Sequence, residues 1–158
     1  MRTVWRLLIE EPEVTLPWMS DNERIAIGWG EIGDIRQLNT FDAIADAIRE
    51  RNANHRDHRG KPEANVQHGA HSLHDFCYAV RPGHLVIVSD RSRRRGVWEV
   101  EGAYEYAEPA AAPLNYQHQR RAQRTEMDPD ALWLQAGGRL ADGQINYRTL
   151  GRCANEVE

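Results

Sequence analysis

The segment with the most chemical character is 25–35, IAIGWGEIGDI, where a large aromatic ring stands between two glycines. Glycine permits backbone conformations closed to other residues and lets a ligand come close, and an indole offers a flat face for stacking. Trp29 and Gly30 are therefore predicted to form one wall of an aromatic slot. The alternative is that Trp29 is a core residue at a strand-to-loop bend. Asp34 can accept a hydrogen bond from an exocyclic amine or cap the next turn, and capping is the favoured role.

The same segment fits the spacing GxGxxG through Gly28, Gly30 and Gly33. A dinucleotide site would need a helix that opens inside this motif and a repeating βαβ pattern. The second half of the chain is instead rich in strand-type residues. The spacing alone therefore does not predict a Rossmann fold.

Two basic segments stand out in a chain whose net charge is -4. Residues 91–95, RSRRR, join two predicted strands, and residues 118–124, HQRRAQR, belong to a neighbouring strand. Arginine forks suit phosphate and supply salt-dependent affinity without sequence information. The alternative for the first segment is a solvated hairpin tip. The residues predicted to contact a nucleic-acid backbone are Arg91, Arg93, Arg94, Arg95, His118, Arg120 and Arg121.

Three aromatic residues share one parity in the predicted strand 96–106, GVWEVEGAYEY. Trp98, Tyr104 and Tyr106 would face one side of a straight strand, although a bulge at Gly102 could break the parity. Core packing is the favoured role for this set. Trp98 is also a candidate for the pocket.

Histidines at spacing three, His68, His71 and His74, follow His55 and His58 and raise the question of a metal site. Zinc needs three or four converging ligands, helical spacing of three spreads these side chains around the axis, and no CxxC pair is present. We therefore predict no metal site. The sequence also offers no nucleophile–base arrangement and no Walker loop with usable context, so no catalytic residue and no cofactor are predicted.

The composition is that of an ordinary globular protein, with 41% hydrophobic and 28% charged residues among 158. This length fits a single domain of 1–158, with a core at about 4–133 and a C-terminal extension at 134–158. No apolar run is long enough to span a bilayer, and the N-terminus lacks the apolar stretch of a signal peptide. A cytoplasmic protein is expected, with Cys77 and Cys153 as free thiols.

Strands are predicted at 4–9 and 24–28, which are short apolar runs, and at 85–90, 96–106 and 116–127, which look like three successive strands. Apolar spacing predicts a helix over 41–52, whereas 53–72 shows no apolar period and is predicted to be a long loop. A short helix should begin at Ser72, a helix or strand should cover 131–135, and a last element should lie near 145–150. This order predicts an α+β fold, a small strongly bent β-barrel flanked by helices.

Several of these segments together resemble an EVE domain of the PUA-like superfamily, which also contains the YTH readers. The similarity covers about 4–133 and lies in VWRLLIEEPE, IGWGEIGDI, SLHDFCYAVRPGHLVIVSDR, GVWEVEGAYEY and YQHQRRAQRTE. It implies a compact barrel with an aromatic pocket for a flipped, modified base, in which Trp29 matches the first pocket tryptophan and Trp98 lies near the second. One departure is Gly83-His84, where many relatives carry Gly-Asp.

This resemblance implies a non-enzymatic reader of DNA that carries a modified base, the specificity module of a modification-dependent restriction system of the McrB-like kind. A nuclease or NTPase domain or subunit is then an implied partner. The pocket is predicted to contain Trp29, Gly30, Asp34, Ser89, Asp90 and Trp98. The alternatives are an RNA reader of the YTH type, a small histidine-based metal protein or enzyme, and a protein-interaction domain.

Overall fold

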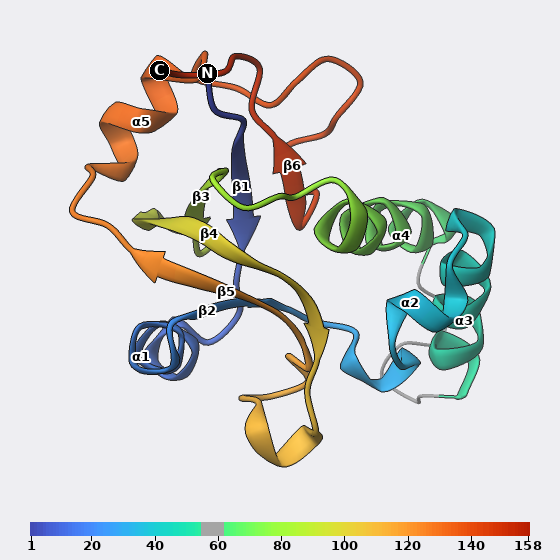
Figure 1. Ribbon diagram of the computed structural model, residues 1–158. Coiled ribbons are helices and arrows are strands. Elements are labelled where there is room, and N and C mark those ends of the chain that lie inside the picture. The colour runs from blue at the N-terminus through green and yellow to red at the C-terminus, as the bar shows by residue number, and fades with distance from the viewer. Residues whose placement is uncertain (55–61) are drawn as a thin grey trace.

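The computed structural model describes residues 1–54 and 62–158, which form one mixed sheet with helices packed against it (Figure 1). The strands are β1 (Val4–Leu8), β2 (Arg24–Ile27), β3 (Leu85–Ser89), β4 (Arg94–Tyr106), β5 (His118–Arg124) and β6 (Leu150–Arg152). The helices are α1 (Pro12–Asn22), α2 (Ile35–Leu38), α3 (Phe41–Asn54), α4 (Glu63–Tyr78) and α5 (Pro129–Gln135), with 3-10 turns η1 (Gly30–Ile32) and η3 (Pro109–Ala111). The predicted α+β class, five of the strands and the helix α3 are confirmed.

The sheet has the order β2-β5-β4-β3-β1-β6, in which β1 and β3 are parallel and the other pairs are antiparallel. A barrel requires the two outer strands to pair with each other. Here β2 and β6 are separated by the four other strands, so the sheet is open and the predicted barrel is not formed. The register of β4 shifts between Val100 and Tyr104, where Gly102 lies. Trp98 and Tyr104 nevertheless face the same core, and both are buried.

Helices cover both faces of the sheet. Buried residues of α1, α3 and α4 pack with Trp98 and Tyr104 in the larger core, whereas Leu132 of α5 packs with Val4 and Ile87 in a smaller one. No helix of the described segments is long and apolar enough to cross a membrane. The cavity described below opens at the end of the sheet where α3 and α4 meet β1 and β2.

Helix α4 begins nine residues before Ser72, the predicted start. The long loop predicted over 53–72 is therefore wrong in its described part, because residues 53–54 end α3 and residues 63–72 belong to α4. Between Val66 and Leu73 the buried face of α4 consists of small side chains, Gly69, Ala70 and Ser72, which give little apolar signal. Pro62 occupies the N-cap position and Glu63 lies in the first turn, where the helix dipole favours a carboxylate. Ser72, predicted as the cap, is buried inside the helix.

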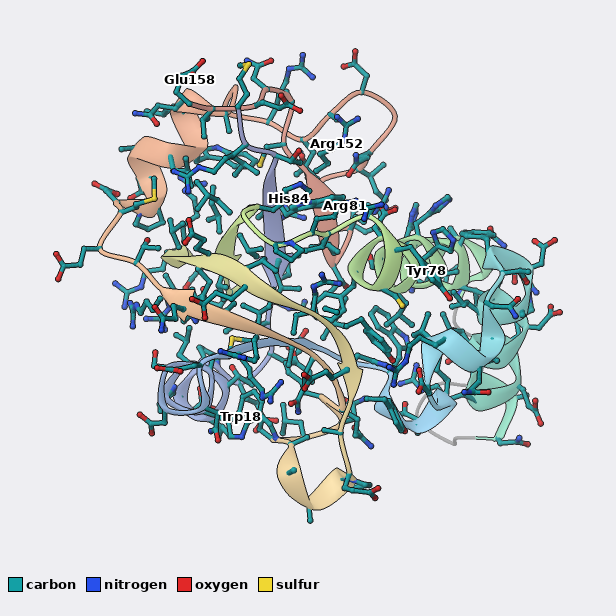
Figure 2. All side chains as sticks on the ribbon, viewed as in Figure 1. Trp18, Tyr78, Arg81, His84, Arg152 and Glu158 are labelled. Carbon is teal, nitrogen blue, oxygen red and sulfur yellow. The ribbon has the colours of Figure 1, made fainter. Side chains whose placement is uncertain are left out.

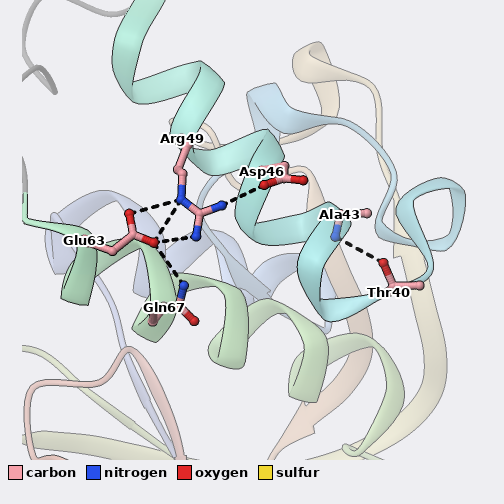
Figure 3. Close-up of polar contacts among 6 residues, drawn as sticks. All are labelled: Thr40, Ala43, Asp46, Arg49, Glu63 and Gln67. Atoms are coloured by element: carbon pink, nitrogen blue, oxygen red, sulfur yellow. Dashed lines mark hydrogen bonds and ion pairs between the residues drawn. The ribbon is translucent and has the colours of Figure 1, made fainter.

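The start of α4 is tied to α3 by Arg49 (Figure 3). Its guanidinium binds Asp46 on its own helix, at 2.7 Å, and the carboxylate of Glu63, which also accepts from Gln67 at 3.1 Å. Thr40 caps α3, because its Oγ1 accepts from the backbone N–H of Ala43 at 3.1 Å. These contacts fix the angle between two helices that both supply cavity residues.

Helix α1 was not predicted, because two prolines in eleven residues argue against a helix. Pro12 is tolerated at the first helical position, and Thr15 and Met19, four residues apart, supply the buried face.

Trp18 of this helix is labelled in Figure 2, far from the turn Arg81–His84 that leads into β3. In that turn His84 Nδ1 accepts hydrogen bonds from Arg81 N at 3.2 Å and Trp5 Nε1 at 3.1 Å. His84 thereby closes this turn.

Candidate functional site

A cavity of about 620 Å³ lies where the ends of β1 and β2 meet α3 and α4. Its volume is within the range of small-molecule sites, roughly 300 to 1,000 Å³. Most of the lining comes from loops and helix faces, while the sheet supplies only strand ends. The lining residues are Leu8, Ile9, Glu10, Gly28, Trp29, Ile48, Arg51, Asn52, Asn65, His68, Gly69, Arg91, Asn115, Tyr116, Tyr147 and Thr149.

Trp29 forms part of this wall from a left-handed backbone conformation, with φ 62° and ψ 29°. For a bulky side chain this conformation costs about 1 to 3 kcal/mol and persists only where neighbours hold it. Its carbonyl accepts from Ile32 N at 3.2 Å and from the His118 ring at 2.9 Å. Gly69 of α4 allows the close approach, because a Cβ there would lie 3.0 Å from the indole Cζ2.

The His118 imidazole belongs to a chain of hydrogen bonds that fixes Trp29. A carbonyl only accepts, so His118 Nε2 carries the hydrogen donated to Trp29 O, and Nδ1 accepts from the Tyr104 hydroxyl at 2.7 Å. The Tyr104 oxygen in turn accepts from Ile35 N at 3.1 Å. Burial lowers the pKa of His118 to about 4. The ring is therefore neutral at physiological pH, as its acceptor role requires.

Three further rings stand around the cavity, and sequence reasoning assigned none of them to a pocket. Tyr116 is buried at the base of the β4–β5 loop, and its oxygen accepts from Glu10 N at 2.9 Å. His68 of α4 lies edge-on to Tyr147, with 5.5 Å between ring centroids. Tyr116 and Tyr147 are 87 and 118 residues beyond Trp29 in the sequence. No local spacing pattern could have joined them to Trp29.

Two arginines and three asparagines supply polar groups of the cavity wall. Arg51 pairs with Glu31, while Arg91 lies 3.2 Å from Glu10 with its side chain 86% exposed. Asn115 Nδ2 donates to Glu31 at 3.1 Å. Burial alone would raise the pKa of Glu31, but hydrogen bonds and the Arg51 charge lower it overall. Glu31 is therefore a carboxylate at neutral pH, and it orients both partners.

The other predicted pocket residues lie outside the cavity lining. Trp98 has no exposed surface and packs in the larger core, so its proposed pocket role is wrong. Gly30 is buried where a Cβ would lie 2.4 Å from the Asn115 carbonyl oxygen, which explains the glycine by packing. Asp34 caps α2 and binds Arg36, which lowers the pKa of Asp34.

Ser89 and Asp90 have structural positions at the end of β3. Ser89 is buried, and its carbonyl accepts from Ile9 N at 2.8 Å. Asp90 binds Arg95 at 2.6 Å and accepts from the backbone N–H groups of Ser92 and Arg93. These bonds hold the pKa of Asp90 far below its usual range. Asp90 therefore shapes the arginine turn and does not reach the cavity.

The two basic segments do not form one continuous groove wall. Arg120 is buried, with its guanidinium donating to the carbonyls of Phe76 and Cys77 at the end of α4, and His118 is buried as described. These two residues cannot contact a nucleic-acid backbone. Arg94 pairs with Asp130 at 2.6 Å and lies over the Trp133 ring. Of the predicted contacts, only Arg91 lines the cavity, while Arg93 and Arg121 are exposed without an ion-pair partner in the described segments.

The histidines of α4 point to different neighbours. His68 contacts Tyr147, His71 contacts Phe41 and His74 contacts Tyr78. No group of three potential metal ligands occurs within 1–54 and 62–158. His55 and His58 lie outside these described residues.

The comparisons with known proteins give a family and no function. A family model with the description "Domain of unknown function (DUF8426)" matches residues 5–135. No curated protein and no solved structure matches the chain significantly. The match ends at the last residue of α5, so it includes Trp29, His68 and Tyr116 and leaves Tyr147 and Thr149 beyond it.

Proposed function

This chain belongs to the DUF8426 family, a domain of unknown function, and we propose that it is a non-enzymatic module that binds nucleic acid through a base held in the cavity beside Trp29. The preferred ligand is DNA in which that base is modified and flipped out of the stack. The observation that carries the proposal is Trp29 itself, a bulky residue held in a left-handed conformation on the wall of a cavity. Backbone strain of this kind gathers at ligand sites.

Three polar groups of the cavity each keep a donor or an acceptor that no residue in the described part of the chain uses. The indole N–H of Trp29 donates to nothing there, and the Tyr116 hydroxyl accepts from Glu10 N but keeps its own hydrogen free. Burial raises the pKa of Tyr116, so that hydrogen stays in place at neutral pH. Asn115 uses its amide N–H₂ on Glu31, which leaves Oδ1 as a free acceptor beside Gly28. Two donors and an acceptor near an aromatic wall suit the edge of a planar heterocycle.

The energetic terms are of the right size for base flipping. Taking a base out of a duplex costs a few kcal/mol, least where the base is damaged or mismatched. Stacking on an aromatic ring returns about 1 to 3 kcal/mol per base, and each hydrogen bond adds about 1 kcal/mol. Stacking on Trp29 and two edge contacts are sufficient. The proposal requires no covalent step.

Arg91 links the cavity to a phosphate backbone. Its side chain is almost fully exposed, and its contact with Glu10 is a surface ion pair, which contributes little and is readily exchanged. Arg93 lies two residues away on the same exposed turn. These two arginines can contact phosphates on either side of a flipped nucleotide and give salt-dependent affinity.

The wider biological setting follows the sequence resemblance. We propose that the domain is related to EVE domains, with the open sheet in place of a closed barrel, and that it serves as the specificity module of a modification-dependent restriction system beside a nuclease or NTPase. The position of the segment GWGEIGD supports this relation. Trp29 of this segment lies in the cavity wall, and the sequence resemblance matches the same residue to a pocket tryptophan of EVE domains.

The test is fluorescence anisotropy of short labelled duplexes whose central base is cytosine, 5-methylcytosine, 5-hydroxymethylcytosine, adenine or N6-methyladenine, with the matching RNA strands as competitors. We expect at least one modified duplex to bind roughly tenfold more tightly than its unmodified form. Trp29→Gly should remove this preference, since glycine adopts the same φ without strain and lacks only the ring. Trp133→Phe, on the opposite side of the sheet, is the matched control. Equal binding of all duplexes by wild type and Trp29→Gly would refute the proposal.

A further inference from the structure

Part of the cavity comes from the segment 142–149, which precedes β6. Tyr147 and Thr149 of this segment line the cavity together with Trp29. The Tyr147 side chain is 67% exposed, yet its ring stands perpendicular to the His68 imidazole, at an interplanar angle of 89°. The ring is thus placed at the rim and leaves most of its surface for a ligand.

One face of α4 holds this segment. His68, Ser72 and Asp75 are spaced i, i+4, i+7 and so form a stripe along the helix. His68 contacts Tyr147, Ser72 Oγ accepts from Leu150 N at 3.1 Å, and Asp75 forms an ion pair with Arg148. Three consecutive points of contact therefore join α4 to residues 147–150.

Arg148 is the central point of that attachment. Its side chain is only 9% exposed and is neutralised by Asp75, while its carbonyl accepts from the guanidinium of Arg6 on β1. Both the helix and the sheet thus hold the backbone beside Tyr147. Breaking one partner of a mostly buried pair leaves the other charge uncompensated, which favours displacement of the segment.

We infer that Tyr147 is the second aromatic wall of the base-binding cavity and determines its specificity, and that Arg148 positions it. This inference rests on the proposed function. A base that stacks on Trp29 is also covered by Tyr147 at the rim, so a substituent that projects toward the rim meets the tyrosine ring. Arg148 contacts no ligand and acts only through the placement of its neighbour.

The test measures the affinity of Tyr147→Phe, Tyr147→Leu, Arg148→Met and the double variant for the same labelled duplexes, with melting temperatures recorded in parallel. Tyr147→Phe should bind as wild type does, and Tyr147→Leu should lose about tenfold or more, the loss of one stacked ring. Arg148→Met should lose affinity in the wild-type background but almost none in Tyr147→Leu. Arg148→Lys, which keeps the charge for Asp75, should restore part of the loss. Tyr78→Leu, another partly exposed tyrosine of the α4 region outside the cavity, is the control.

The outcomes separate the inference from the proposed function. If wild type binds a modified duplex and Trp29→Gly does not, while Tyr147→Leu binds as wild type does, the inference is wrong and the function stands. Additive losses for Tyr147→Leu and Arg148→Met would refute the positioning role of Arg148. If wild type binds none of the duplexes, the proposed function and the inference both fail.

Discussion

The stability of the fold should fall in mild acid because His118 is buried as a neutral ring. Its pKa is about 4 in the folded protein and about 6.5 in an unfolded chain. Between these values the unfolded chain binds a proton that the folded protein does not. The free energy of unfolding therefore falls by about 1.4 kcal/mol per pH unit as pH drops through this window, or about 3 kcal/mol in all. That is a large share of the roughly 5 to 15 kcal/mol that stabilises a domain.

Urea denaturation followed by circular dichroism, at a series of pH values from about 7.5 to 4, measures this loss. The control is His118→Gln, whose amide N–H₂ can still donate to the Trp29 carbonyl but which has no imidazole to titrate. The excess loss of about 3 kcal/mol should disappear in His118→Gln and remain in His74→Gln, which alters a histidine outside the network. Asp34, Glu31 and His84 also have lowered pKa values, but they are common to all three proteins and cancel in the comparison. Parallel stability curves for wild type and His118→Gln would refute the hydrogen-bond chain.

Three further predictions follow from the site. Gly30→Ala should destabilise the fold by about 3 kcal/mol or more in urea denaturation, because the new Cβ would lie 2.4 Å from a backbone oxygen. Asp34→Ala should cost about 1 kcal/mol of stability through loss of the α2 cap and leave duplex affinity unchanged. A fall in affinity without a fall in stability would instead make Asp34 a base contact. Raising salt should weaken binding of the modified duplex, and Arg93→Gln should lower the slope of log affinity against log salt by about one. An unchanged slope would remove Arg93 from the interface.

The strands β1, β2 and β3 were predictable because most of their residues are apolar, and α3 was predictable because Ile44, Ala45 and Ile48 recur at helical spacing. Helix α4 was not predictable, because Val66 is the one large apolar residue on its buried face before Leu73. That the sheet is open also could not be predicted from the sequence. No short sequence pattern indicates that β2 and β6 lie at opposite edges of the sheet.

Trp29 was found because the glycines around it mark unusual backbone. Trp98 was predicted to form the second wall of the pocket, but it is a core residue. In β5 the even positions His118, Arg120 and Ala122 are all buried. Because alternate residues of a strand face the same side, the apolar Ala122 already indicated that Arg120 faces the core. When this alternation is ignored, all the arginines of the segment 118–124 are wrongly expected to lie on the surface.

The cavity joins residues at and just after the end of the first strand, Leu8 to Glu10, to Tyr147 and Thr149. The same two regions meet again where β6 pairs with β1 and where Arg6 binds the Arg148 carbonyl. During synthesis, the lining of the cavity is complete only after residues around position 150 have left the ribosome. A translation product that stops before these residues would lack the Tyr147 and Thr149 side of the cavity and the strand β6 that pairs with β1.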